Sequence, residues 1–175
     1  MTYLGIDIGS TCAKSVIMNK ERGILDTFVI PTGWSSLEAL KEIKEKLRIK
    51  GYNFEDMYCI STGYGRQAVE GAKKRVTEIT CHAKGASVLF GEDTFNIVDI
   101  GGQDTKVISC HKGKVMEFYM NDKCSAGTGK FLEIMANRLN VTLADLDRIA
   151  RDHTEQLQIS AMCTVFAESE IVSLI

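Results

Sequence analysis

The chain has 175 residues, which is enough for a substantial core in one domain or in two small lobes. Hydrophobic residues make up 45% and the formal net charge is −2, so nothing points to nucleic acid or to an acidic membrane surface. The N-terminal run MTYLGIDIGS lacks the basic start and apolar stretch of a signal peptide, and no apolar run reaches the length of a membrane span. We therefore expect a cytoplasmic protein that binds neither nucleic acid nor membrane.

The first motif in the chain, DIGSTCAKSVI from Asp7, recurs as DIGGQDTKVI from Asp99. In both copies four residues and then a lysine follow the D-I-G triplet. A strand-like run precedes each copy, and a polar turn with another strand-like run follows it. One D-I-G triplet is weak support for any function, but two copies predict a duplicated unit of strand, glycine loop, strand, turn and strand.

The two glycine loops carry residue types that suit a magnesium nucleotide. A carboxylate at the end of a strand, Asp7 or Asp99, can hold Mg²⁺ directly or through water. Glycines let the backbone approach phosphate oxygens, and polar side chains add donors. The candidate phosphate-binding residues are Gly9, Ser10, Thr11, Cys12, Ala13 and Lys14 in the first copy and Gly101, Gly102 and Gln103 in the second, with Thr105 and Lys106 as further donors. We expect the two hairpins to face one another across one nucleotide.

Three further elements are predicted between the copies, because apolar residues recur there at helical or strand spacing. They are a helix over 35–49 with Ser35 or Ser36 as its cap, a strand and glycine turn over 55–66, and a helix over 78–91. A boundary follows the second helix, so we expect two lobes, 1–92 and 93–175.

Residues 121–135, NDKCSAGTGKFLEIM, join a glycine-rich turn to an apolar helical pattern. The turn is not a P-loop, because Cys124 stands where the first glycine is required and Phe131 stands where Ser or Thr is required. Cys124 and Cys163 each precede a predicted helix, whose positive end stabilises a thiolate. Six cysteines in a reducing compartment indicate buried thiols, metal ligands or redox groups rather than disulfides. On these residues alone, two unrelated structural thiols are the better interpretation.

Six blocks of sequence, taken in order, carry a resemblance to a known family. They are DIGSTCAK, TGYGR, EITCHAKGA, DIGGQDTK, NDKCSAGTGKFLEIMA and CTVFAESEI. The duplicated hairpin is similar to that of the actin, Hsp70 and sugar-kinase superfamily, and the whole set resembles the ATP-dependent activators of 2-hydroxyacyl-CoA dehydratases. The implied fold is α/β, an actin/Hsp70-like (ribonuclease H-like) ATPase with duplicated lobes. Family members continue into a segment that contacts adenosine, so we expect the second lobe to be incomplete and the chain to be truncated at its C-terminal side.

The resemblance implies that Cys124 and Cys163 bind a [4Fe-4S] cluster, with backbone N–H groups of residues 126–129 directed at it. A cubane cluster takes four thiolates, so two per chain imply a homodimer that shares one cluster. The implied activity is ATP-driven transfer of one electron to a 2-hydroxyacyl-CoA dehydratase in anaerobic metabolism, after reduction by a donor such as ferredoxin or flavodoxin. Asp7 and Asp99 would then position Mg²⁺ and the attacking water.

Several points stay open at the level of sequence. Glu168 and Glu170 lie in the FAESEI block, where they are either functional groups or exposed charges on a helix. The alternative functions are an iron–sulfur carrier or scaffold without ATPase activity, an ATPase subunit of the benzoyl-CoA reductase type, and a sugar or acetate kinase of the same superfamily. The acyl-CoA pathway that the protein serves is not encoded in these motifs.

Overall fold

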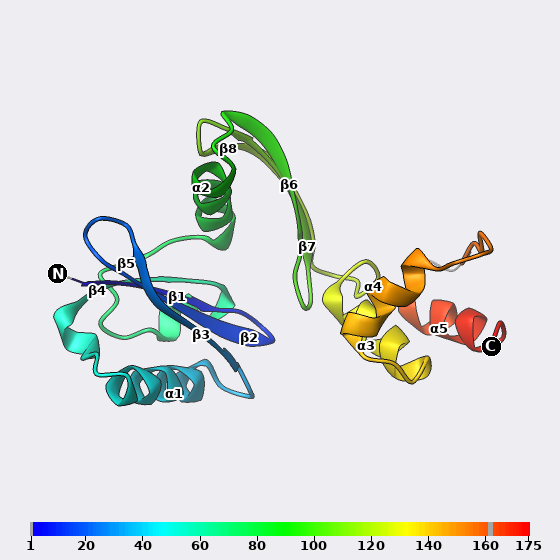
Figure 1. The fold of residues 1–175 in the computed structure, drawn as a ribbon, viewed down its shortest axis with the longest axis horizontal. Coiled ribbons are helices and arrows are strands. Elements are labelled where there is room, and N and C mark those ends of the chain that lie inside the picture. The colour runs from blue at the N-terminus through cyan, green and yellow to red at the C-terminus, as the bar shows by residue number, and fades with distance from the viewer. Residues whose placement is uncertain (1, 161–162) are drawn as a thin grey trace. The chain divides into compact units, whose positions relative to one another are not determined.

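The structure is a computed structural model that describes residues 2–160 and 163–175. It divides into two compact units, Met1–Phe95 with Cys110–Met116 and Asn96–Ser109 with Glu117–Ile175, and each is described by itself. Figure 1 shows the course of the chain through both units. The predicted lobes, 1–92 and 93–175, stay a prediction, and Ala161 and Met162 of the SAMC sequence lie outside the described residues.

The first unit contains a five-stranded sheet in the order β3-β2-β1-β4-β5. Its strands are β1 (Thr2–Ile8), β2 (Cys12–Met18), β3 (Ile24–Pro31), β4 (Met57–Thr62) and β5 (Lys74–Arg75). The strand β1 runs antiparallel to β2 and parallel to β4, so Asp7 lies opposite Lys14 on one side and Thr62 on the other. This arrangement places Asp7 near the carboxyl end of two parallel strands, a common location for binding sites in α/β sheets.

Two helices belong to the first unit and confirm the sequence prediction. Helix α1 (Ser36–Ile49) begins where the Ser35 side chain accepts a hydrogen bond from Leu37 N at 3.3 Å. One face of α1 is buried through Ala39, Leu40, Ile43 and Leu47. Helix α2 (Glu78–Phe90) ends at Gly91, whose φ of 69° is accessible to glycine at little cost. The short helices η1 (Phe54–Asp56) and η2 (Tyr64–Ala68) flank β4.

The second copy of the repeat forms a three-stranded sheet in the order β6-β7-β8. Its strands are β6 (Thr94–Ile100), β7 (Thr105–His111) and β8 (Lys114–Asn121). A two-residue turn joins β7 to β8, with φ of 50° at Lys112 and 69° at Gly113, as in a tight hairpin. The predicted duplication of strand, glycine loop, strand, turn and strand is therefore confirmed.

Three helices follow, α3 (Gly129–Arg138), α4 (Leu143–Arg151) and α5 (Thr164–Val172). Cys163 is the N-cap of α5, as predicted. The prediction that a helix begins directly after Cys124 is wrong, because α3 begins only at Gly129 with Thr128 as its N-cap. The delay has a local cause: Gly127 has a φ of 75°, a left-handed conformation that cannot continue a right-handed helix.

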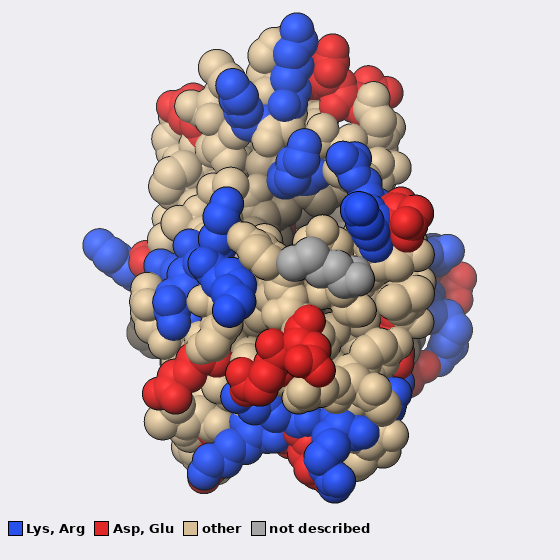
Figure 2. All heavy atoms as spheres, turned by 90° about the vertical axis from the view of Figure 1, so that its left-hand side faces the viewer, with Lys and Arg blue, Asp and Glu red and all other residues tan. Residues whose placement is uncertain are grey.

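Within the described residues, no helix is both long enough and apolar enough to cross a bilayer. Figure 2 shows basic and acidic side chains on the same face of the molecule. The mixture agrees with the small net charge of −2 and does not indicate an extended basic surface.

Candidate functional site

An aspartate at the end of β1 and a lysine in β2, on the two sides of the first glycine loop, are in contact. Lys14 Nζ lies 3.0 Å from Asp7 Oδ2. The Lys14 side chain is 50% exposed, so its ammonium group is accessible to a further anion, whereas Asp7 is 19% exposed. The second carboxylate oxygen, Asp7 Oδ1, is buried and has no hydrogen-bond partner among residues 2–160 and 163–175. A buried carboxylate oxygen without a partner is rare in folded proteins and suits a cation or an ordered water.

The glycine turn after β4 packs closely against Asp7. Gly63 has a φ of 84°, and a Cβ at this position would collide with Asp7 Oδ1 and with the carbonyl of Ile8. Thr62, the register partner of Asp7, also has a buried side-chain oxygen without a hydrogen-bond partner. The TGYGR block therefore supplies a polar group beside Asp7, a role that the sequence analysis did not assign to Thr62.

Thr32, directly after β3, holds the first glycine loop through hydrogen bonds. Gly9 N donates to Cys12 O at 3.1 Å, which closes the loop, and a Cβ on Gly9 would lie 3.0 Å from the same oxygen. Thr32 donates twice, from Oγ1 to Gly9 O at 2.8 Å and from N to Thr11 O at 2.9 Å. These bonds leave the loop carbonyls occupied and hold the loop in one conformation.

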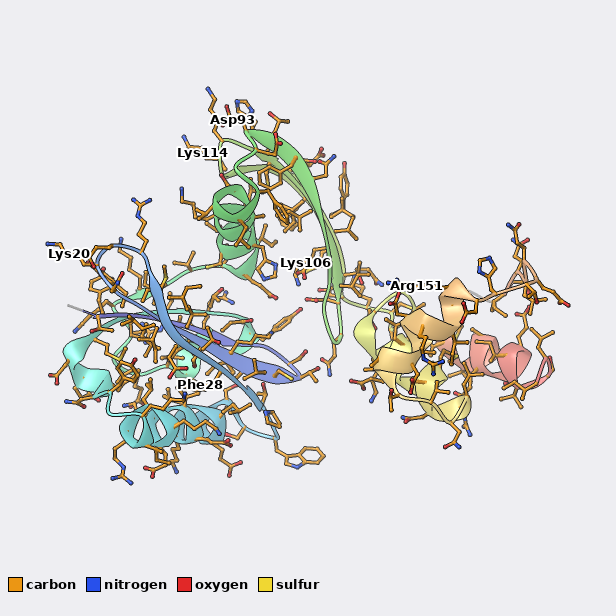
Figure 3. The ribbon with its side chains drawn as sticks, in the orientation of Figure 1. Lys20, Phe28, Asp93, Lys106, Lys114 and Arg151 are labelled. Carbon is orange, nitrogen blue, oxygen red and sulfur yellow. The ribbon has the colours of Figure 1, made fainter. Side chains whose placement is uncertain are left out.

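The second glycine loop has the same closing bond but a different charge arrangement. Gly101 N donates to Asp104 O at 2.8 Å. Lys106 Nζ lies 2.8 Å from Asp104 Oδ2 and 3.5 Å from Asp99 Oδ2, and its side chain is only 2% exposed. Figure 3 shows Lys106 on the hairpin that follows β6. Two carboxylates compensate one buried ammonium group, which is the condition for keeping a lysine charged inside a protein.

The two lysines of the repeat are therefore not equivalent. Lys14 is half exposed and pairs with one carboxylate, whereas Lys106 is enclosed by two. The expectation that Lys106 adds charge to a phosphate site is wrong, because burial and ion pairing occupy its ammonium group. The expectation that Thr105 donates to a phosphate is also wrong, since its hydroxyl donates to Gly127 O at 2.5 Å.

The Cys124 turn, residues 122–128, is held by the side chain of Asn121 at the end of β8. Asn121 Nδ2 donates to Cys124 O at 2.9 Å and to Ala126 O at 3.3 Å, and Cys124 N donates to Asn121 Oδ1 at 3.2 Å. One amide thus makes three bonds to the turn. Cys124 itself is an exposed free thiol.

The start of α3 is bonded to the second glycine loop. Gly129 N donates to Gly101 O at 2.8 Å, and Lys130 N donates to Gly102 O at 2.9 Å. A Cβ on Gly129 would lie 3.1 Å from Gly101 O, so glycine permits this approach. The expectation that N–H groups of 126–129 face a cluster is wrong for Gly129 and for Thr128, whose N–H donates to Ser125 O at 3.1 Å.

The start of α5, directly after Cys163, contacts the Cys124 turn through two hydroxyl groups. Ser125 Oγ lies 3.0 Å from Thr164 Oγ1, and these residues directly follow the two cysteines in the chain. Cys163 is an exposed free thiol. The two candidate cluster ligands therefore stand on segments that are in direct contact.

Glu168 and Glu170, whose roles were open, hold α5 and the segment before it. Glu168 pairs with Arg138 of α3. Both carboxylate oxygens of Glu170 accept from Ser160 N at 3.1 Å, three residues before Cys163. Neither glutamate was assigned such a role from sequence, because the partners lie 30 and 10 residues away.

The remaining cysteines differ in their environments. Cys59 and Cys110 are buried, and Cys12 and Cys81 are half-buried. Burial raises the pKa of the Cys59 thiol to about 11, with Lys44 opposing the rise, and burial also raises the pKa of Cys110. These two thiols are therefore poor nucleophiles and poor metal ligands compared with exposed ones.

The duplicated hairpins and the mixed α/β sheets define the actin/Hsp70-like fold class. Residues 4–174 match the BadF/BadG/BcrA/BcrD ATPase family, and the chain belongs to that family. The (R)-2-hydroxyglutaryl-CoA dehydratase activating ATPase of Acidaminococcus fermentans is 43% identical over 172 residues, which cover 97% of this chain and 66% of the relative.

Two crystal structures are similar over almost the whole chain. The A. fermentans (R)-2-hydroxyglutaryl-CoA dehydratase component A has a TM-score of 0.90 at 42% identity, covering 99% of this chain and 67% of that one. The activator of the 2-hydroxyisocaproyl-CoA dehydratase from Clostridium difficile, with bound ADPNP, has a TM-score of 0.89 at 39% identity, covering 99% and 65%. The chain thus spans about two thirds of the length of these relatives.

Proposed function

We propose that this chain is the nucleotide- and cluster-binding part of an ATP-driven activator of a 2-hydroxyacyl-CoA dehydratase. A low-potential donor such as ferredoxin or flavodoxin supplies an electron, and hydrolysis of ATP accompanies the transfer of one electron to the dehydratase. The observation that carries the proposal is the 3.0 Å contact between Ser125 and Thr164, because it joins the segments of Cys124 and Cys163 in a member of an ATPase family.

The residues around the two cysteines fit a [4Fe-4S] cluster. Cys124 and Cys163 are exposed free thiols, and Cys163 caps a helix whose positive end favours an anionic ligand. When bound, the cluster accepts and releases single electrons. Asn121 holds the turn of Cys124, and Cys163 is the N-cap of α5, so both cysteines stand on described structural elements.

The proposed partner in cluster binding is a second copy of the chain. Two thiolates per chain supply half of the four that a cubane cluster takes. Val165 and Phe166, directly after Cys163, are 65% and 68% exposed. A two-fold homodimer with the cluster on its axis would complete the ligand set and cover these apolar side chains.

The first glycine loop fits magnesium and phosphate. Asp7 Oδ1 and Thr62 Oγ1 are buried polar atoms without partners, and they suit a hydrated Mg²⁺ ion. Lys14 is half exposed, so it can contact a phosphate oxygen while it stays paired with Asp7. In this proposal Asp7 and Asp99 position Mg²⁺ and the attacking water, and Gly9–Lys14 and Gly101–Gln103 bind phosphate. The predicted placement of the two hairpins across one nucleotide stays a prediction.

We also propose that the protein works in the cytoplasm, where its cysteines stay reduced. All six cysteines are free thiols, as is usual for a reducing compartment. The donor, the dehydratase and their acyl-CoA substrates would then be in the same compartment.

An anaerobic reconstitution with iron and sulfide tests the proposal. We expect about two irons per chain, from four thiolates shared by a dimer, and a native mass of two chains. We also expect ATP hydrolysis that Asp7→Asn reduces while the iron content is unchanged. Asp26→Asn is the matched control, since Asp26 also pairs with a lysine, Lys50, at 2.6 Å.

The same assay separates the alternatives. A brown dimer with no response to nucleotide would indicate an iron–sulfur carrier or scaffold, and phosphorylation of a sugar or of acetate would indicate a kinase. Electron transfer to a benzoyl-CoA reductase but not to a 2-hydroxyacyl-CoA dehydratase would indicate the benzoyl-CoA type. A monomer that holds a complete cluster would contradict the shared site.

A further inference from the structure

The two copies of the repeat align residue for residue, from Asp7 to Lys14 and from Asp99 to Lys106. Both copies pair their first aspartate with their last lysine, and both close the loop with the same backbone bond. Among their differences are the two residues before the lysine, which are Cys-Ala in the first copy and Asp-Thr in the second. The second copy therefore carries two polar side chains that the first copy lacks.

The first of these additional side chains, Asp104, holds Lys106 inside the hairpin at 2.8 Å. The second, Thr105, faces out of the hairpin and donates its hydroxyl hydrogen to Gly127 O at 2.5 Å. A hydroxyl has a single hydrogen to donate, so this bond excludes donation to a phosphate at the same time. The corresponding residue of the first copy, Ala13, is fully buried and can make no such bond.

Gly127 lies in the Cys124 turn, three residues after the cysteine. The backbone bonds from Gly129 and Lys130 join the second loop to the start of α3, directly after this turn, and they involve no side chain. Thr105 supplies the side-chain bond between the second glycine loop and this turn. Through Ser125 and Thr164 the turn also contacts the residue after Cys163.

We infer that Thr105 is a positioning residue that transmits the nucleotide state of the second glycine loop to the Cys124 turn. The inference rests on the proposed function, because it takes Gly101–Gln103 as phosphate ligands and Cys124 as a cluster ligand. A shift of the loop on exchange of ATP for ADP moves Thr105, and its short bond to Gly127 moves the turn. Such a transmission requires that the two nucleotides favour different loop positions, since equal affinity for both would move nothing.

The test measures the accessibility of Cys124 in the cluster-free protein expressed from the whole gene. A soluble maleimide labels the protein with Mg-ADPNP, with Mg-ADP and with no nucleotide, and peptide mass spectrometry reports the labelling rate at Cys124 alone. In the wild type we expect a several-fold difference in rate between the two nucleotides. In Thr105→Val we expect the same rate with both nucleotides, and in Thr105→Ser, which keeps the hydroxyl, we expect the difference to return.

The controls separate transmission from a structural role. A purely structural loss would change the Cys124 rate by one factor in all three conditions and leave the ratio between nucleotides intact. Ser109→Ala removes another hydroxyl of β7, which bonds Asn96 at 2.9 Å, and should leave the ratio unchanged. Thr105→Ala, which copies Ala13 of the first hairpin, replaces Thr105→Val if the valine variant does not fold. Calorimetry should give the same ADPNP affinity for all variants.

Two results would overturn the inference, and they differ from failure of the proposed function. The inference is wrong if Thr105→Val keeps the wild-type ratio of Cys124 labelling rates between the two nucleotides. It is also wrong if the wild type binds nucleotide without any change in the labelling rate at Cys124. In both cases the proposed activator function still stands on the iron content and on ATP hydrolysis. If the wild type binds neither nucleotide nor iron, the proposed function fails and the inference fails with it.

Discussion

The ammonium group of Lys106 lies 2.8 Å from the carboxylate of Asp104, and both side chains are at most 5% exposed. The corresponding Lys14 is 50% exposed and pairs with Asp7 alone. One lysine of the repeat is thus part of the core of its hairpin, and the other is available to a ligand.

Lys14→Met should mainly weaken nucleotide binding, whereas Lys106→Met should mainly lower the free energy of unfolding. Loss of Lys14 removes a charged donor to phosphate, so ADPNP affinity in calorimetry should fall about tenfold or more. The free energy of unfolding should fall less than in Lys106→Met, because the ammonium group of Lys14 is half exposed and solvent screens its pair with Asp7. Loss of Lys106 leaves buried carboxylates uncompensated and should lower the free energy of unfolding by about 3–5 kcal/mol in urea. Equal losses of stability in both variants would contradict the assignment.

Gly63→Ala should disturb Asp7 through a steric collision. The new Cβ would meet Asp7 Oδ1 and the backbone of Ile8, and the φ of 84° is unfavourable for alanine. We expect a loss of at least about 2 kcal/mol in the free energy of unfolding. Gly51→Ala is the control, because Gly51 has a φ of 82° but open space around its Cα, so only backbone strain of about 1 kcal/mol is expected there. Similar losses for both glycines would show that the contact with Asp7 is unimportant.

Cys124→Ser and Cys163→Ser should each abolish the iron content of the reconstituted protein, because a cluster on a two-fold axis loses two of its four thiolates at once. Cys81→Ser should keep it, since Cys81 is a half-buried thiol outside the Cys124 turn. Iron and sulfide analysis after anaerobic reconstitution decides the outcome. Normal iron in either of the first two variants would remove that cysteine from the ligand set.

Asn121→Ala should loosen the Cys124 turn without removing a ligand. The amide makes three bonds to the turn, and hydrogen bonds of this kind contribute about 1 kcal/mol each at most. We expect an iron chelator to strip the cluster about tenfold faster than in the wild type. Asn53→Ala, which removes the cap of η1, is the matched control and should strip at the wild-type rate. An unchanged rate in Asn121→Ala would mean that the turn is held by its backbone alone.

The free energy of unfolding should fall as the pH rises from 9 to 11. Burial raises the pKa of Cys59 from its ordinary value of 9.0 to about 11, so in this window the folded chain keeps a proton that the unfolded chain has lost. The contribution of the Cys59 thiol to the free energy of unfolding is fully present below pH 9. It has declined by about 2 kcal/mol at pH 11. Urea unfolding at several pH values should show a steeper decline in the wild type than in Cys59→Ala. Parallel curves would mean that other groups cause the alkaline loss.

The secondary structure of the first half could be predicted because its signals are local. A serine, Ser35 or Ser36, before an amphipathic run predicted the start of α1, and the apolar pattern predicted a helix over 78–91, close to the observed α2. The repeat of D-I-G and lysine predicted two hairpins, and both are present. These signals depend on residues within one turn or one strand pair, which the sequence shows directly.

The start of α3 could not be predicted from the apolar pattern alone. The pattern after Cys124 is helical, but the left-handed conformation of Gly127 delays the helix to Gly129. Gly129 then donates to Gly101 O, a partner 28 residues earlier in the sequence. Glycine permits both a helix and a turn, and the contact with the second glycine loop decides between them.

The sequence by itself determined the family motifs, the two aspartate-to-lysine hairpins and the pair of cysteines with a glycine-rich turn. Only the tertiary structure decided that Lys106 is enclosed while Lys14 is exposed, that Thr105 bonds Gly127, and that Ser125 meets Thr164 across 39 residues of chain. The reason is physical: burial and hydrogen bonding between distant residues depend on how the chain packs. A lysine, a threonine or a serine in a motif has the same side chain whether its partner is solvent, phosphate or another part of the protein.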